Sequence, residues 1–403
     1  MVRWSNGVAI RYNDCRILFD AAESDPTIPN LFISHAHFDH SKGFQFPTQK
    51  KYSTNETKQI YEAQSSQVVG NWQPIRVGRR LKLGEVEVEA HDAGHVLGSV
   101  QYEVITPEGN IVYASHINFT DTLTSRAAEV APCETLVIEA TFPAPGMSLP
   151  PREHVIAEMV KWTLECIHDK RIPTFAVDSL GIAQELTRVF NTWTELSVVV
   201  HPQIARVNKV YVENDVGLRY VDSSSVDAQS LVGHDECIVL VPKRFDATRF
   251  GDFRVANVTG WPNLTRGAED RVFTLSDQAD LEQLLRFVQE TRPKTVLTFR
   301  GGSKILAELV SKKFGMIGRE LAREVRSRRA VETKIDQERV ALCEDALRKI
   351  VEIPEYTYER GDLLTLSLKE GFKTQEIEQA LLQLTRKGEF NYSAVTDGYT
   401  KRQ

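Results

Sequence analysis

Short hydrophobic runs that alternate with polar residues dominate the first 150 positions, a pattern typical of β-strands. We predict strands over residues 7–12, 15–19, 31–34, 80–83, 85–90, 100–106, 110–115 and 135–138. Turn-forming residues separate several of them, such as Pro107, Glu108 and Gly109 between positions 106 and 110. This part of the chain is therefore expected to build β-sheets.

The pattern changes near residue 151, after which strands and helices alternate. Helices are predicted at 153–169, 182–193, 277–291 and 303–314, and strands at 173–177, 197–201, 238–242, 255–258 and 295–299. Such alternation predicts a parallel sheet. A basic helix with five arginines is predicted over residues 318–330. Its ordinary interpretation is a solvated face, and a phosphate-facing surface is the alternative.

The last part of the chain, residues 331–403, is predicted to form a separate unit. Helices at 335–351, 361–368 and 374–387 precede a hairpin at 390–400, which is the order of a winged helix. Acidic and basic residues are nearly balanced from residue 353 onward. This balance favours a protein partner or a homodimer over recognition of a DNA groove.

Composition narrows the class of protein. The chain has 403 residues and a formal net charge of −6, so nucleic acid would have to bind through a local basic patch. The five cysteines form no CxxC pair, which argues against disulfides and zinc fingers and favours a cytoplasmic location. No apolar run is long enough for a transmembrane helix, and we expect no membrane partner.

The strongest chemical signal directly follows the predicted strand at 31–34. Three imidazoles and a carboxylate fall within six positions: His35, His37, Asp39 and His40. Nitrogen and oxygen donors of this kind suit zinc, and a loop after a strand lets them converge on it. Glycines on both sides of His95 would let a further imidazole approach the same ion.

These segments resemble the metallo-β-lactamase superfamily, and within it the β-CASP branch of nucleic-acid-processing proteins. That branch includes mRNA 3′-end processing factors and ligase-associated exonucleases. The resemblance rests on segments in the family's order: a strand ending in Asp20, an HxHxDH motif at 35–40, an AGHxLGS motif at 93–99, a strand with Glu139, and a strand–loop–helix at 177–185.

The resemblance implies an α/β fold. Residues 1–150 and 272–330 would form an αββα metallo-β-lactamase sandwich with a β-CASP domain inserted at 151–271, before the winged-helix-like unit at 331–403. It also implies one or two zinc ions. By position, His35, His37 and His95 would hold the first ion, and Asp39 and His40 the second. Glu139 would act with Asp39 near the substrate, and Asp20 would orient the metal ligands.

Three positions depart from the family pattern. His116 replaces a carboxylate that bridges both metals, and Gln278 replaces a histidine that acts at the leaving group. Arg300 replaces a histidine that ligates the second metal in RNA-cleaving members and that DNA-repair members also lack. A neutral imidazole binds one ion and does not bridge two, and a glutamine cannot transfer a proton near neutral pH. Gln278 can still bond a phosphate oxygen, and an arginine binds phosphate well.

His116 therefore has two interpretations. It could complete a second-metal site with Asp39 and His40, or it could fill space beside the first metal while Arg300 occupies the second site as a fixed positive charge. The first favours a zinc-dependent nuclease. The second favours a non-cleaving paralogue that binds nucleic acid or serves as a scaffold in an RNA-processing or DNA-repair complex.

The substrate is expected to be single-stranded RNA or DNA, bound in the cleft between the metal domain and the β-CASP insert. Ser179 and Gly181 lie in a loop before a predicted helix, where backbone N–H groups could bind a phosphate. An ordinary strand–helix turn is the alternative. Arg300 would contact a phosphate as well.

Overall fold

The computed structural model describes residues 1–141, 148–233, 237–245, 252–261, 270–321, 337–351, 358–359, 374–393 and 398–401, together with Leu363, Ser367 and Phe372. The chain divides into two compact units, Met1–Glu324 and Val325–Gln403. The predicted domain boundary at residue 330 lies outside the described residues.

Two sheets face each other in the first unit. One contains, in spatial order, β1 (Val2–Trp4), β2 (Val8–Tyr12), β3 (Cys15–Phe19), β4 (Asn30–Phe32), β5 (Lys50–Ser53) and β6 (Trp72–Pro74). The other has the order β19-β18-β11-β10-β9-β8-β7 and comprises β7 (Arg80–Leu83), β8 (Val86–Asp92), β9 (Val100–Thr106), β10 (Gly109–Ala114), β11 (Thr135–Glu139), β18 (Thr295–Phe299) and β19 (Ile317–Glu320). Aromatic residues of both sheets, including Phe19, Phe32, Tyr102 and Tyr113, fill the space between them.

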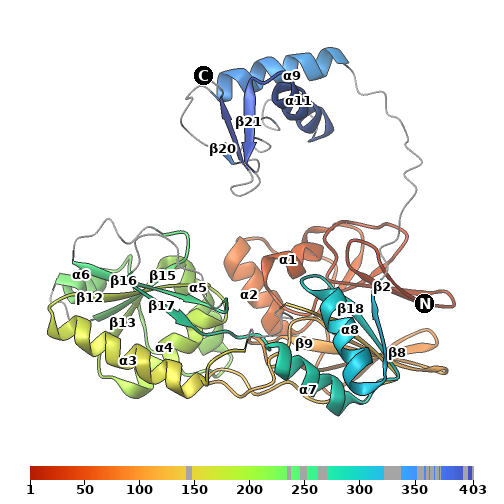
Figure 1. The fold of residues 1–403 in the computed structure, drawn as a ribbon, viewed down its shortest axis with the longest axis horizontal. Coiled ribbons are helices and arrows are strands. Elements are labelled where there is room, and N and C mark those ends of the chain that lie inside the picture. Colours follow the sequence, from red (N-terminus) through yellow and green to blue (C-terminus); the bar gives the residue numbers. More distant parts are fainter. Residues whose placement is uncertain are drawn as a thin grey trace. The chain divides into compact units, whose positions relative to one another are not determined.

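Helices cover the outer faces of both sheets, which gives the predicted αββα sandwich (Figure 1). Successive residues of β11 point to opposite faces, so Val137 joins the core between the sheets while Leu136 and Ile138 meet α7 (Leu281–Thr291) and α8 (Ser303–Phe314). The first sheet is flanked by α1 (Phe38–Ser41), the 3₁₀ turn η1 (Lys42–Gln45) and α2 (Asn55–Ser65).

A third sheet is inserted between β11 and β18 of the sandwich, and all its strands are parallel, as the sequence predicts. Its order is β14-β13-β15-β12-β16-β17, comprising β12 (Ile172–Val177), β13 (Ser197–Val200), β14 (Val221–Asp222), β15 (Cys237–Pro242), β16 (Phe253–Thr259) and β17 (Arg271–Thr274). The helices α3 (Arg152–His168), α4 (Ile182–Trp193) and α5 (Pro202–Glu213) pack on one face and α6 (Val226–Gly233) on the other. Every residue of β12 is buried, as expected of a strand covered on both faces.

The predicted basic helix over residues 318–330 is wrong at its start. Ile317–Glu320 forms β19, which pairs in parallel with Thr295–Thr298 of β18. A neighbouring strand offers a ladder of backbone partners, and this long-range pairing overrides the local helical pattern. Residues 322–330, with most of the arginines, lie outside the described residues. The sequence pattern also missed α2, α5 and several short edge strands.

The second unit has a core of its own. Helices α9 (Gln337–Ile350) and α11 (Thr374–Arg386) pack through Leu347, Ile377 and Leu381 beside an antiparallel sheet of β20 (Tyr358–Glu359), β22 (Gly398–Lys401) and β21 (Phe390–Ser393). Most of the predicted helix at 361–368 lies outside the described residues, so the winged helix stays a prediction. Within the described ranges of either unit, no helix combines the length and apolar character needed to cross a membrane.

Candidate metal centre

The loop that follows β4 carries four of the predicted ligands. His35 is buried at the end of this strand segment, and His37 lies at the N-terminus of the short helix α1. Within that helix the Asp39 side chain is 58% exposed, whereas His40 is fully buried. The segment therefore presents one carboxylate toward solvent and keeps its imidazoles inside the molecule.

Asp20, at the end of β3, supports this loop in the position that the sequence predicts. Its carboxylate accepts hydrogen bonds from the Ser34 backbone N (2.8 Å), the Ser34 Oγ (2.6 Å), His40 Nδ1 (2.8 Å) and the Tyr113 hydroxyl (2.7 Å). A carboxylate only accepts, so His40 carries its proton on Nδ1. Burial alone would lower the pKa of His40, but Asp20 and Asp39 raise it to about 10, so its Nε2, which faces the site, gives up a proton when it binds a metal.

His95 enters the site from the turn between β8 and β9. Gly94 has φ +70° and Gly98 φ +75°, and a Cβ on Gly94 would lie 2.4 Å from the Asn118 carbonyl oxygen. The Ser99 Oγ accepts from the backbone N of His95 (3.2 Å) and of Val96 (3.0 Å). Only glycine fits this left-handed turn at so close an approach, and the turn therefore fixes the root of the imidazole.

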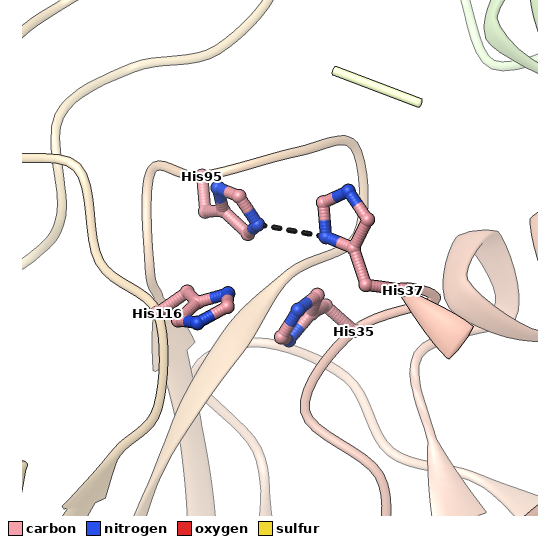
Figure 2. Close-up of side chains that lie close together, drawn as sticks. All are labelled: His35, His37, His95 and His116. Atoms are coloured by element: carbon pink, nitrogen blue, oxygen red, sulfur yellow. Dashed lines mark hydrogen bonds between the residues drawn. The ribbon is translucent and has the colours of Figure 1, made fainter. Parts of the chain in front are cut away.

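The four histidines His35, His37, His95 and His116 converge, with one ring nitrogen of each within 4.8 Å of the others (Figure 2). His95 Nε2 lies 3.0 Å from His37 Nδ1. His95 Nδ1 donates to the Asp277 backbone oxygen (2.8 Å), which leaves the Nε2 lone pair facing its neighbours. The Nε2 of buried His35 has no hydrogen-bond partner among the described residues. An orphaned buried nitrogen beside converging imidazoles fits a bound metal ion.

The charge state of these rings suits a metal ion as well. Burial and the neighbouring imidazoles lower the pKa of His37 to about 4. The same two causes lower the pKa of His35 and of His95 well below the usual range. Neutral imidazole is the form that binds a metal, so these three rings are ready to bind at neutral pH.

His116 lies between the two halves of the site. Its Nε2 is 3.2 Å from Glu139 Oε1, and its Nδ1 is 3.4 Å from Gln278 Nε2. Burial alone would raise the pKa of Glu139, but His116, His40 and Arg300 together bring it down to about 2. Glu139 is therefore an ionised, buried carboxylate. Gln278 lies beside the histidines, where the sequence predicts a group near the reacting phosphate.

Arg300 occupies the other half of the site. Its Nη1 lies 3.0 Å from Asp39 Oδ2, 2.8 Å from His40 Nε2 and 3.4 Å from Glu139 Oε1. Among the described residues, His40 and His116 form a possible ligand group with Glu139, whereas Asp39 lies 3.0 Å from His40 Nε2 but forms no such group with His40 and His116 together. Of the two interpretations of His116, this arrangement matches the one in which Arg300 fills the second site.

The loop at 178–181 is held by contacts within the protein. The Gly181 backbone N donates to Gln184 Oε1 (2.7 Å), and the Ser179 carbonyl accepts from Gln184 Nε2 (3.0 Å). A Cβ on Gly181 would collide with the Asp277 carboxylate. This N–H is already used, so the geometry favours the ordinary strand–helix turn over the phosphate contact predicted for Gly181.

Two contributions to the site escaped the sequence interpretation. Asp277 orients His95 through its backbone oxygen, and Tyr113 bonds Asp20 through its hydroxyl. Both belong to segments compared with the family, but neither has a local pattern that marks such a role. Every residue type has a backbone oxygen, so the residue type at position 277 does not indicate that its oxygen orients His95.

No family model matches the chain. Two curated relatives are 26% identical to it: a protein named "Probable DNA ligase" from Opitutus terrae, over 70% of this chain and 28% of that protein, and an "RNase J-like protein" from Methanocaldococcus jannaschii, over 45% and 48% respectively. The chain thus spans less than half of either relative.

A crystal structure of a protein of unknown function from Enterococcus faecalis superposes with a TM-score of 0.55 at 15% identity. The match covers 74% of this chain and 93% of that one, and it supports the fold alone. The sandwich, the inserted parallel sheet, the histidine cluster and the set of relatives all agree with the resemblance of this chain to the metallo-β-lactamase superfamily and its β-CASP branch.

Proposed function

We propose that this protein is a zinc-dependent phosphodiesterase that cleaves single-stranded RNA or DNA. The observation that carries the proposal is the convergence of His35, His37 and His95, with the orphaned Nε2 of His35 inside the cluster. Three imidazoles leave one position open on a tetrahedral ion, as catalytic zinc sites require. A zinc ion held there supplies Lewis-acid chemistry and an activated water.

A polar cavity beside the histidines supports a nucleotide substrate. It has a volume of about 340 Å³ and is lined in part by Lys243, Asn257, Thr259 and Gln278. The buried Asn257 Oδ1 has no partner among the described residues, and Lys243 bonds Asp178 at 2.5 Å. An amide oxygen, a hydroxyl and an ammonium group can together bond a base edge and a phosphate.

Metal content tests the first half of the proposal. Elemental analysis of protein purified without chelator is expected to find at least one zinc per chain, and His37→Ala should lower the zinc content because it removes one of the converging imidazoles. His168→Gln is the control, since His168 is exposed on α3 far from the cluster in sequence. Metal-free wild type would contradict the proposal.

Cleavage and binding assays test the second half. Among labelled single- and double-stranded RNA and DNA, at least one of the single-stranded substrates should be cut by the wild type and none by His37→Ala. Affinity for single strands should fall steeply as salt rises, because phosphate contacts release counterions. Binding that ignores salt would contradict a phosphate-based interface.

A non-cleaving, nucleic-acid-binding subunit is the second proposed function. Two observations favour it: Arg300 lies between Asp39 and His40, the arrangement expected of such a subunit, and Gln278 and His116 meet where the family pattern has a proton-transferring histidine and a bridging carboxylate. Zinc-loaded protein that binds single strands with salt-dependent affinity, yet cuts none of the four substrates, would support this alternative. A protein partner or a homodimer formed through residues 331–403 would fit the same role.

A further inference from the structure

We propose that Arg300 takes the place of a second metal ion, so that the centre combines one metal with one built-in organic cation. The inference rests on the proposed function, because it takes the site of His35, His37 and His95 as occupied. It concerns the other half of the centre, where residues that could ligate a second ion are already bonded to a guanidinium.

The distances place one nitrogen of Arg300 where a second ion would have to lie. Nη1 is 2.8 Å from His40 Nε2 and 3.0 Å from Asp39 Oδ2, and these two atoms are 3.0 Å from each other. His40 donates from Nδ1 to Asp20, so Nε2 is the nitrogen that would have to bind a second ion. A metal ion would need the same lone pairs and the same space.

Arg300 is held in place both at its backbone and at its guanidinium group. Arg300 has φ +55°, a left-handed conformation that ordinary side chains seldom adopt. Its carbonyl accepts from the Ser303 backbone N at 2.9 Å, and a Cβ on the next residue, Gly301, would collide with the Ala140 carbonyl oxygen. At the other end, Cζ lies over the Trp4 ring, 5.7 Å from its centroid. The charge is thus anchored, and it does not swing freely on a flexible arm.

The charges of the site agree with this assignment. Arginine stays protonated at any physiological pH, and here it neutralises part of the charge of Asp39 and Glu139. His116 stands beside Glu139 and brings no negative charge of its own. A second dication would meet a fixed positive charge at contact distance and one carboxylate fewer than the family pattern supplies.

Arg300 in place of a second metal ion could also bind the substrate phosphate. Among the described residues, Arg300 contacts Asp39, His40 and Glu139 through Nη1 alone. Its other nitrogens can then donate to an oxygen of the substrate phosphate, which guanidinium groups bind well. The chain would thus present a positive charge to the phosphate without recruiting a second ion.

Metal stoichiometry tests the inference directly. Wild type saturated with Zn²⁺ and desalted is expected to hold one ion per chain, and Arg300→Lys should also hold one because the charge remains. Arg300→His should hold two, since the new imidazole joins Asp39 and His40. Arg300→Gln removes the charge and leaves Asp39, His40 and Glu139, so it too should take up a second, weaker ion if Arg300→His fails to fold. Arg286→Gln, on an exposed arginine of α7, is the control and should hold one.

Co²⁺-loaded samples give a second readout that does not depend on activity. Two ions in the neighbouring half-sites should couple magnetically in Arg300→His and not in wild type, as measured by electron paramagnetic resonance. Two ions in wild type would overturn the inference and leave the proposed function standing, whereas no ion at all would overturn both. One ion in both Arg300→His and Arg300→Gln would also overturn it, because something other than Arg300 would then exclude the second metal.

Discussion

At the scale of single residues, the Asp20 carboxylate connects the metal-binding loop to both sheets. It is 3% exposed and accepts hydrogen bonds from Ser34, His40 and Tyr113. Three segments that are remote in sequence therefore meet at one pair of oxygen atoms. The orientation of His40, and with it the way Arg300 is held, depends on this carboxylate.

Asp20→Asn is expected to lower the free energy of unfolding by about 2–3 kcal/mol, because the new amide N–H₂ would face donors that have no other acceptor. Chemical denaturation of the metal-free protein measures the effect. Asp14→Asn, in an exposed turn of the same hairpin, should change stability by less than about 0.5 kcal/mol. Equal stability of Asp20→Asn and wild type would show that the hydrogen bonds to Asp20 add little.

The buried histidines predict how stability depends on pH. The pKa of His37 is lowered to about 4 in the folded state, against about 6.5 in an unfolded chain. Between these values the unfolded state binds a proton that the folded state rejects, so stability falls as pH falls. Metal-free wild type should lose about 2 kcal/mol through His37 alone between pH 7 and pH 5.

Thermal or chemical unfolding of His37→Ala beside wild type isolates this contribution. The variant should show a shallower pH dependence over the same interval, while His168→Gln should follow wild type. Parallel curves for wild type and His37→Ala would mean that His37 takes up its proton in the folded state without penalty.

At the scale of elements, the turn between β8 and β9 decides where His95 lies. Gly94→Ala would force a left-handed alanine and push its Cβ to within 2.6 Å of the Ala128 backbone N. We expect a loss of several kcal/mol in stability and weaker zinc binding, because overpacking adds about 1–3 kcal/mol to the backbone strain. A zinc competition titration and chemical denaturation measure the two effects.

Gly84→Ala is the matched control for this turn. Gly84 has a similar φ of +66°, but a Cβ there would meet nothing within 4 Å. Only the backbone cost of about 1 kcal/mol is expected, with zinc affinity unchanged. If both variants behave alike, the close contacts around Gly94 do not position His95.

At the scale of the whole molecule, the two units have separate cores. Every histidine of the metal centre, and Arg300 as well, belongs to Met1–Glu324, whereas the core around Leu347 and Leu381 belongs to the second unit. A chain ending at residue 330 should therefore keep its metal content and the unfolding midpoint of the first unit. Light scattering of both chains shows whether the second unit mediates dimerisation, and loss of metal on truncation would contradict independent units.

The sequence by itself determined the residue types that define the class of site. The HxHxDH cluster, the glycines around His95 and the alternation of strands and helices after residue 151 are local patterns. These patterns depend on the number of ligand residues in a short segment, on the backbone freedom of glycine and on the spacing of hydrophobic residues. Each of these properties acts within a few residues of the chain. The parallel sheet followed from the alternation of strands and helices, whereas the αββα sandwich and the grouping of His35, His37 and His95 followed from the family resemblance that these motifs carry.

Only the tertiary structure decided what surrounds these ligands. Arg300 reaches His40 across 260 positions of sequence, and the Asp277 backbone orients His95 across 182. The strand β19 replaced part of a predicted helix because β18 lay beside it. Local patterns specify which groups a chain can offer. The packing of the sheets decides which distant side chain comes to lie beside Asp39 and His40, and in this fold that side chain is Arg300.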